Sequence, residues 1–239
     1  MAAEMLARPE SAVPPCRIRQ IFIALLLYFV LSFLLGVALG FLGVLGPRAV
    51  APRLADEFVL LALATTGFLL LLTMHLARRA RGGIRQVFGM AAQGKGLASL
   101  FGAAVGFGVA PVGMALLKLA MAQLPGGILE FRLKTGLEEA AIHAPLLILF
   151  LMVVAAPIAE EAFFRGLAYP AFRARFGVTL ASLFTTLLFV PLHLSMLALI
   201  PLTLLSLVLC LLREVHGSVT GPIAAHAIYN LTLLLGLAG

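Results

Sequence analysis

The chain contains few charged residues and few cysteines. Asp, Glu, Lys and Arg make up 11% of its 239 residues, whereas hydrophobic residues make up 62%. Because a soluble domain has roughly 25% charged residues, this composition excludes a sizeable soluble domain. The two cysteines, Cys16 and Cys210, suggest neither a disulfide framework nor a thiolate metal site. We therefore expect a polytopic membrane protein in which Cys210 is a small apolar side chain.

The hydrophobic residues form long runs separated by short polar stretches. We interpret residues 1–20 as a polar N-terminal tail and residues 21–239 as a single membrane-embedded helical domain. The first run is longer than the roughly 7–15-residue core of a signal peptide, so we expect a retained helix. The predicted fold is an all-α transmembrane bundle of about seven or eight helices. The predicted spans are 21–46, 58–77, 97–121, 140–168, 179–194, 196–212 and 218–237.

The polar stretches between the spans predict a turn at 47–57, a short basic loop at 169–178 and another loop at 213–217. Two glycine pairs, Gly36 with Gly40 and Gly102 with Gly106, have the spacing that lets helices pack closely. We interpret both pairs as helix-packing sites.

The distribution of Lys and Arg predicts a cytoplasmic N-terminus. If the chain crosses the membrane seven times, twelve basic residues, including Arg165, lie on the same side of the membrane as the N-terminus. Four lie on the opposite side. The most basic stretch, residues 78–85, is interpreted as a cytoplasmic loop near anionic lipid. We therefore expect the lipid bilayer as a partner and no nucleic acid.

Two adjacent glutamates end a long apolar run. Residues 144–159 carry no charge, and Glu160 and Glu161 follow directly. An ionisable group at membrane depth is costly and indicates a functional site. Glu161 and Arg165 are four residues apart, so on one helix they can pair, whereas Glu160 points about 100° away. Pro157 is expected to loosen or kink the helix one turn before them.

Three further polar residues lie in later apolar segments. His193 follows an apolar run, and His226 and Asn230 are four apart, on one face of the last helix. A carboxylate near two imidazoles and an amide is a combination that can activate water. Glu160 can accept a proton, His193 can orient the water, and the other two side chains can stabilise an oxyanion. Each histidine alone is equally compatible with helix–helix hydrogen bonding.

These residues carry a family resemblance. The segment Ala156-Pro157-x-x-Glu160-Glu161-x-x-Phe164-Arg165-Gly166, followed by Phe189-x-x-x-His193 and His226-x-x-x-Asn230, resembles the three motifs of the CPBP family. This family, also called Abi, comprises CAAX-protease and bacteriocin-processing proteins related to type II CAAX prenyl endopeptidases. The motifs cover residues 156–230, about a third of the chain, and their order is the specific part of the signal.

The resemblance implies an intramembrane endopeptidase that hydrolyses a peptide bond in a water-filled cavity. The catalytic residues that it implies are Glu160, His193, His226 and Asn230, with Glu161 and Arg165 as structural support. The substrate that it implies is a peptide or protein, and prenylated C-terminal peptides are the substrates of the eukaryotic branch. The expected location is the plasma or inner membrane in a bacterium and the endoplasmic reticulum in a eukaryote.

Metal dependence is left open by the residue types. Glu160, His193 and His226 are plausible zinc ligands, but the sequence has no His-Glu-x-x-His helix. We favour a mechanism without a cofactor because the base role requires Glu160 to be free, and zinc is the alternative. Glu138-Glu139 with His143 resembles a ligand cluster, but we assign it to a helix start at the interface.

Two other functions are compatible with the sequence. Buried carboxylates and histidines also occur in proton-coupled transporters, although no repeated halves are evident here. A non-proteolytic binding or immunity protein that keeps the site is the other alternative. Cleavage of a peptide library discriminates between these functions.

Overall fold

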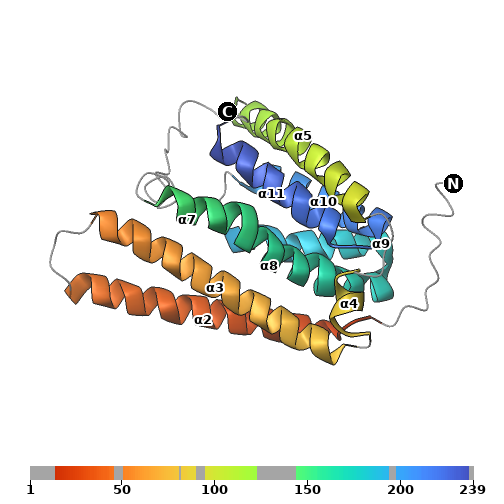
Figure 1. The fold of residues 1–239 in the computed structure, drawn as a ribbon, viewed down its shortest axis with the longest axis horizontal. Helices are drawn as coiled ribbons and strands as arrows, with labels where there is room; N and C mark the ends of the chain where they lie inside the picture. The colour runs from red at the N-terminus through yellow and green to blue at the C-terminus, as the bar shows by residue number, and fades with distance from the viewer. Residues whose placement is uncertain are drawn as a thin grey trace.

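The computed structural model describes residues 14–45, 51–80, 82–89, 95–122, 144–193 and 198–236. Within these ranges all regular structure is helical, which confirms the predicted all-α bundle (Figure 1). The α-helices are α2 (Ile18–Leu45), α3 (Ala51–Arg79), α4 (Gly83–Val87), α5 (Lys95–Ala122), α7 (Pro145–Phe150), α8 (Ala156–Phe163), α9 (Tyr169–Phe189), α10 (Leu199–His216) and α11 (Thr220–Leu234). Two π-helical turns, η1 (Leu151–Ala155) and η2 (Phe164–Ala168), and a 3₁₀ turn, η3 (Val190–His193), join some of them.

Five helical segments in the described part of the chain are long and apolar enough to cross a membrane. They are Ile18–Ala38, Val59–Arg79, Gly96–Leu117, Pro145–His193 and Leu199–His216. The 49-residue segment is about 73 Å long at 1.5 Å per residue, more than twice a membrane core. It is therefore long enough to cross twice.

The long segment folds back at Gly177. This glycine has φ 76° and ψ 177°, a conformation that other residues rarely adopt. Figure 1 shows the chain turning back within α9, which packs against α10. The predicted loop at 169–178 is therefore wrong in extent, because residues 169–176 are helical. Glu160 and Arg165 consequently lie within a continuous helical run, residues 145–176.

Both π-helical turns precede a proline. Pro157 is the second residue of α8, and Pro170 is the second residue of α9. A proline ring clashes with the carbonyl four residues earlier, and widening the turn to π-helical geometry relieves this clash. The predicted loosening of the helix before Pro157 is confirmed, whereas the second π-turn was not anticipated.

Several helix boundaries differ from the predicted spans. Helix α2 begins at Ile18, and α3 begins at Ala51, so Pro52 lies in its first turn, where a missing N–H costs nothing. Helix α10 continues to His216, through most of the loop predicted at 213–217.

Cys16 precedes α2 and is buried against the core. It is 7% exposed, and its thiol lies 3.9 Å from the carbonyl oxygen of Leu167. Burial raises the pKa of the Cys16 thiol to about 12, so the thiol is neutral and unreactive at pH 7. The last residues of the predicted tail thus belong to the folded domain.

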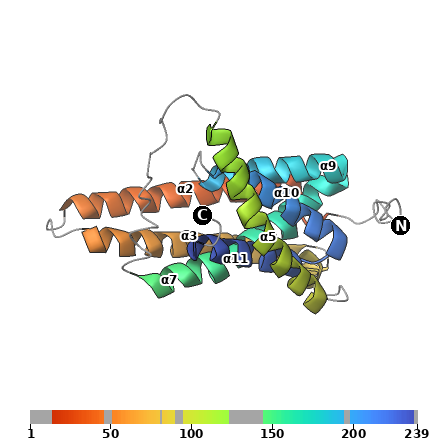
Figure 2. The same cartoon turned by 90° about the horizontal axis from the view of Figure 1, so that it is seen from above.

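Helix α8 occupies the centre of the bundle, between α3 on one side and α11 on the other (Figure 1). Helix α5 crosses α11 obliquely (Figure 2).

A Cβ atom added at Gly102 or Gly106 would lie 2.2 Å or 2.1 Å from a carbonyl oxygen of α11, so the predicted packing at this pair is confirmed. Among the described residues nothing lies within 4 Å of a Cβ built at Gly36, so no helix contact is seen at this glycine.

Candidate active site

Glu160 and His193 face each other from different segments. Glu160 lies on α8 and His193 ends η3, and Oε2 of the carboxylate is 3.9 Å from Nε2 of the imidazole. The side chains are 20% and 29% exposed, respectively. Glu160 Oε2 is itself buried and has no hydrogen-bond partner among the described residues. The distance is too long for a direct hydrogen bond, so an acceptor remains unused beside an imidazole nitrogen.

The other nitrogen of His193 fixes its tautomer. Nδ1 lies 3.3 Å from the carbonyl oxygen of Phe189, one helical turn earlier. A carbonyl oxygen only accepts, so Nδ1 carries the hydrogen and Nε2 of the neutral ring has a lone pair. In the neutral form of His193, two acceptors, its Nε2 and Oε2 of Glu160, therefore face each other.

Glu161 and Arg165 form the ion pair that their spacing predicted. Arg165 Nη1 donates to Glu161 Oε1 at 3.0 Å, and both side chains are fully buried. The pairing is therefore confirmed, but it lies in the protein core. A buried pair of this kind is weak evidence for net stability, but removing one partner leaves an uncompensated charge. Arg165 was counted among the cytoplasmic charges, and its burial removes it from that count.

His226 on α11 joins this ion pair and does not contact Glu160. Its Nδ1 is 2.9 Å from Glu161 Oε1, and the ring is 2% exposed. Because Glu161 is paired with a guanidinium, its carboxylate is an acceptor and Nδ1–H of His226 donates to it. Nε2 of a neutral His226 is therefore an acceptor, and it becomes a donor only in the imidazolium form.

Phe189 connects the two groups. Its ring centroid lies 4.8 Å from that of His193, 5.9 Å from that of His226 and 4.8 Å from Cζ of Arg165. The ring is fully buried and also packs edge-on against Phe164. The phenylalanine of the second motif thus fixes the positions of both imidazoles and lies against a buried cation.

Asn230 stabilises the kink at Pro157. In η1 the N–H of Ala156 bonds the carbonyl of Leu151, five residues earlier. The next carbonyl, that of Met152, would bond residue 157, but proline has no N–H. Nδ2 of Asn230 donates to this oxygen at 2.8 Å, which leaves its second amide hydrogen available. The third motif therefore fastens α11 to the helix that carries Glu160.

Two further residues at the site, Ser206 and Thr186, were not predicted from the sequence. Arg165 Nη2 donates to Ser206 Oγ at 2.8 Å and to the Ser206 carbonyl oxygen at 3.0 Å. Ser206 Oγ lies 2.9 Å from Thr186 Oγ1. Both hydroxyl residues are buried. One serine in an apolar helix does not stand out in a single sequence. The only indication of such a partner was that Glu161 cannot satisfy all the N–H donors of the Arg165 guanidinium.

The candidate zinc ligands do not come together. In the part of the chain that the structure describes, no three His, Cys, Asp or Glu side chains form a group that could hold a metal ion. Nδ1 of His226 bonds Glu161, and Oε2 of Glu160 lies 3.9 Å from Nε2 of His193. This donor arrangement does not fit a three-ligand zinc site. The Glu138-Glu139 and His143 cluster lies outside the described residues.

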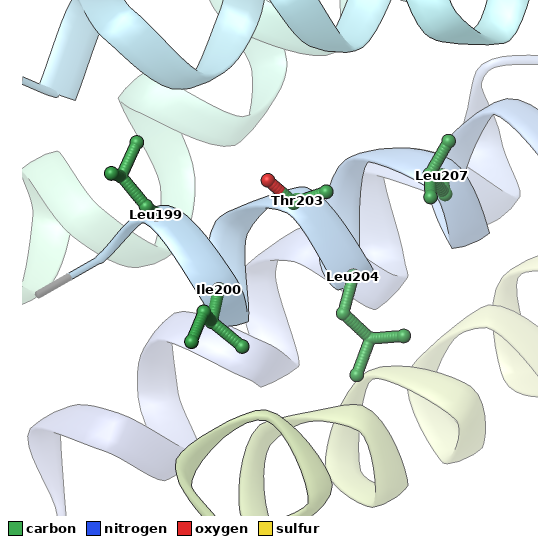
Figure 3. A pocket seen from close by; sticks show the side chains of 5 residues that line it. All are labelled: Leu199, Ile200, Thr203, Leu204 and Leu207. Atoms are coloured by element: carbon green, nitrogen blue, oxygen red, sulfur yellow. The ribbon is translucent and has the colours of Figure 1, made fainter. Parts of the chain in front are cut away.

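An open hollow of about 340 Å³ lies along α10, apart from these residues (Figure 3). Thr203 supplies its only hydroxyl, and the other lining side chains are aliphatic: Leu199, Ile200, Leu204 and Leu207. It has no group that could activate water, and its surface suits hydrocarbon.

Comparison with known proteins identifies the segment that carries the site. Residues 142–232 match the family model "Type II CAAX prenyl endopeptidase Rce1-like". No match was found among curated proteins or solved structures. The matched segment includes Glu160, His193, His226 and Asn230, so the family found by comparison is the one that the motifs resembled. Residues 142–232 are therefore similar to an Rce1-like domain, and the chain that contains them is an integral membrane protein.

Proposed function

We propose that this protein is an intramembrane endopeptidase that hydrolyses a peptide bond with water activated by Glu160. One observation carries the proposal. Glu160 has a buried, unpartnered carboxylate oxygen 3.9 Å from an imidazole nitrogen within an Rce1-like domain. A free carboxylate next to a second acceptor is suited to general-base catalysis.

Water fits between Glu160 and His193 because both groups accept. A water oxygen about 2.8 Å from each acceptor lies to one side of the 3.9 Å line that joins them. The water then donates one hydrogen to Oε2 and the other to Nε2, and its lone pairs are free for attack. A contact of this length between two acceptors is often bridged in this way.

The reaction proceeds in two proton transfers. The water oxygen attacks the carbonyl carbon of the peptide while Glu160 takes its proton. The protonated Glu160 then gives this proton to the amide nitrogen, and the carbon–nitrogen bond breaks. The products are a carboxylic acid and an amine, and Glu160 returns to its carboxylate form.

The oxyanion is stabilised by His226 and Asn230. Nε2 of His226 donates in the imidazolium form, and Asn230 donates its second amide hydrogen. Glu161 and Arg165 hold the His226 ring in place. The two negative charges of the Glu160 and Glu161 carboxylates then equal the two positive charges of the Arg165 guanidinium and the His226 imidazolium. The net charge of the site stays the same in the next step, because Glu160 loses its negative charge on protonation and the oxyanion gains one.

The substrate in this proposal is a peptide or protein segment that reaches the site within the membrane. The family description names prenyl endopeptidases, so a peptide with a lipidated C-terminus is the first substrate to test. No metal takes part in the steps above.

The proposal is tested with purified protein in lipid nanodiscs and a library of fluorescent peptides, with and without a prenylated C-terminal cysteine. We expect cleavage by the wild type and none by Glu160→Ala. Glu214→Gln is the matched control, since Glu214 pairs with Arg173 and takes no part in the mechanism. Cleavage by Glu160→Ala at the wild-type rate would reject the role of Glu160.

A further inference from the structure

We propose that α10 clamps Arg165 at both ends and that Ser206 and Arg213 are positioning residues of the active site. The inference deepens the proposed function, on which its catalytic consequence rests. No motif residue lies on α10, yet Ser206 and Arg213 of this helix make three hydrogen bonds with Arg165.

The main-chain end of the clamp is created by Pro170. In η2 the N–H of Tyr169 bonds the carbonyl of Phe164, five residues earlier. The next carbonyl, that of Arg165, would bond residue 170, which is proline and has no N–H. Arg213 Nε donates to this oxygen at 2.9 Å. A charged donor thus stabilises a carbonyl that the helix leaves without a partner.

The same arrangement occurs at Pro157. There Asn230 of α11 donates to the Met152 carbonyl, and here Arg213 of α10 donates to the Arg165 carbonyl. Two prolines, each after a π-turn, therefore fasten the central helix to two different C-terminal helices. The segment between them carries both glutamates.

The side-chain end of the clamp is Ser206. Its Oγ and carbonyl oxygen both accept from Arg165 Nη2. Because Oγ accepts from a guanidinium that cannot accept, its own hydrogen is available for Thr186 Oγ1. Thr186 on α9 therefore orients the Ser206 hydroxyl, which is fully buried.

The clamp acts on the reaction through Arg165. With Nη2 held by Ser206, Nη1 points at Glu161 Oε1, which also accepts from His226. Rotation of the guanidinium would leave Glu161 without its counter-charge and His226 without a fixed partner. Ser206 and Arg213 thus determine the position of an imidazole that neither of them touches.

The first test removes the Ser206 hydroxyl. Ser206→Ala is expected to lower turnover of a cleaved library peptide on the order of 10-fold with little change in KM. Thr186→Val is expected to do the same more weakly, and Thr186→Ser, which keeps the hydroxyl, to restore turnover. The control is Thr73→Val, since the buried Thr73 hydroxyl on α3 bonds the Leu69 carbonyl of its own helix.

A readout independent of cleavage is the imidazole NMR signal of His226. The protein is labelled with ¹⁵N-histidine, and the signal is assigned by its loss in His226→Gln. Ser206→Ala is expected to shift the Nδ1–H resonance, and Thr73→Val to leave it in place. An unchanged resonance and unchanged turnover in folded Ser206→Ala would overturn the proposal. If the wild type cleaves no peptide, the resonance still tests the clamp, so its failure is distinguishable from failure of the protease.

The second test uses Pro170. Pro170→Ala restores a backbone donor to the carbonyl of Arg165, so Arg213 becomes less necessary. Arg213→Met is expected to lower the thermal midpoint of the wild type, and to lower that of Pro170→Ala by less than half as much. Equal losses in both backgrounds would overturn the role of Arg213. This cycle also decides the matter if Ser206→Ala does not fold.

Discussion

The aromatic ring of Phe189 lies 4.8 Å from Cζ of the buried Arg165, and the rings of His193 and His226 contact the same phenylalanine. A desolvated cation–π contact contributes about 2 kcal/mol. The ring also maintains the separation of the two histidines, so a change here affects both the stability and the chemistry of the site.

Replacing Phe189 tests this relationship. Phe189→Leu keeps an apolar side chain but removes the ring, and we expect destabilisation by about 2 kcal/mol with a loss of turnover. Stability is measured as the thermal midpoint in detergent. Phe176→Leu is the control, because Phe176 makes a comparable contact with Arg175 at 5.6 Å but is 38% exposed. Equal effects of the two substitutions would show that the ring at 189 has no special role.

Arg165→Ala is expected to be severely destabilising. It leaves Glu161 buried with an uncompensated charge, at a cost of about 3–5 kcal/mol. Arg175→Ala changes an exposed arginine ten residues further along the chain and is expected to cost less than about 0.5 kcal/mol. Both are compared by thermal unfolding in detergent. A wild-type midpoint for Arg165→Ala would mean that the pair is hydrated in the membrane.

Local patterns in the sequence predicted the parts of the site that lie within one helical turn. The pairing of Glu161 with Arg165 follows from their spacing, and the disturbance before Pro157 follows from proline chemistry. The contact of His226 with Glu161 could not be predicted from the sequence, because it depends on how α11 packs against α8. Contacts between residues 65 positions apart are a property of the fold.

The errors in the fold have a similar cause. Pro170 and the arginines after it are typical of a loop, yet the helix continues because α10 supplies partners for one of its carbonyls and one of its arginines. Arg213 bonds the Arg165 carbonyl, and Glu214 pairs with Arg173. Both partners lie more than 40 residues away. The sequence around Pro170 carries no trace of them.

The Asn230 amide is assigned two roles, stabilisation of the oxyanion and a hydrogen bond to the Met152 carbonyl. A substitution at Pro157 distinguishes them. Asn230→Ala is expected to reduce turnover on the order of 10²–10³-fold if the amide stabilises the oxyanion. Pro157→Ala returns a backbone donor to the Met152 carbonyl and so removes the need for a cap there. The account predicts that Asn230→Ala is equally inactive in the Pro157→Ala background, measured as turnover of the same peptide. Recovery of turnover in the double variant would assign Asn230 to the kink alone.

Chelation tests the metal-independent mechanism. We expect cleavage to survive exhaustive treatment with a strong zinc chelator, because Glu160 is the base and no three-ligand group is found in the described structure. Elemental analysis of active protein is expected to find far less than one equivalent of zinc. Stoichiometric zinc, lost together with activity and restored by adding the metal, would refute the mechanism.

The central claim is that Glu160 takes the proton of the attacking water. Glu160→Gln preserves the size of the side chain and its capacity for hydrogen bonding but cannot act as a base. The most direct measurement compares the binding and turnover of one peptide, cleaved by the wild type, in wild type and Glu160→Gln. The account predicts an unchanged Kd and thermal midpoint with no detectable turnover. Wild-type turnover in Glu160→Gln, with binding intact, would contradict it.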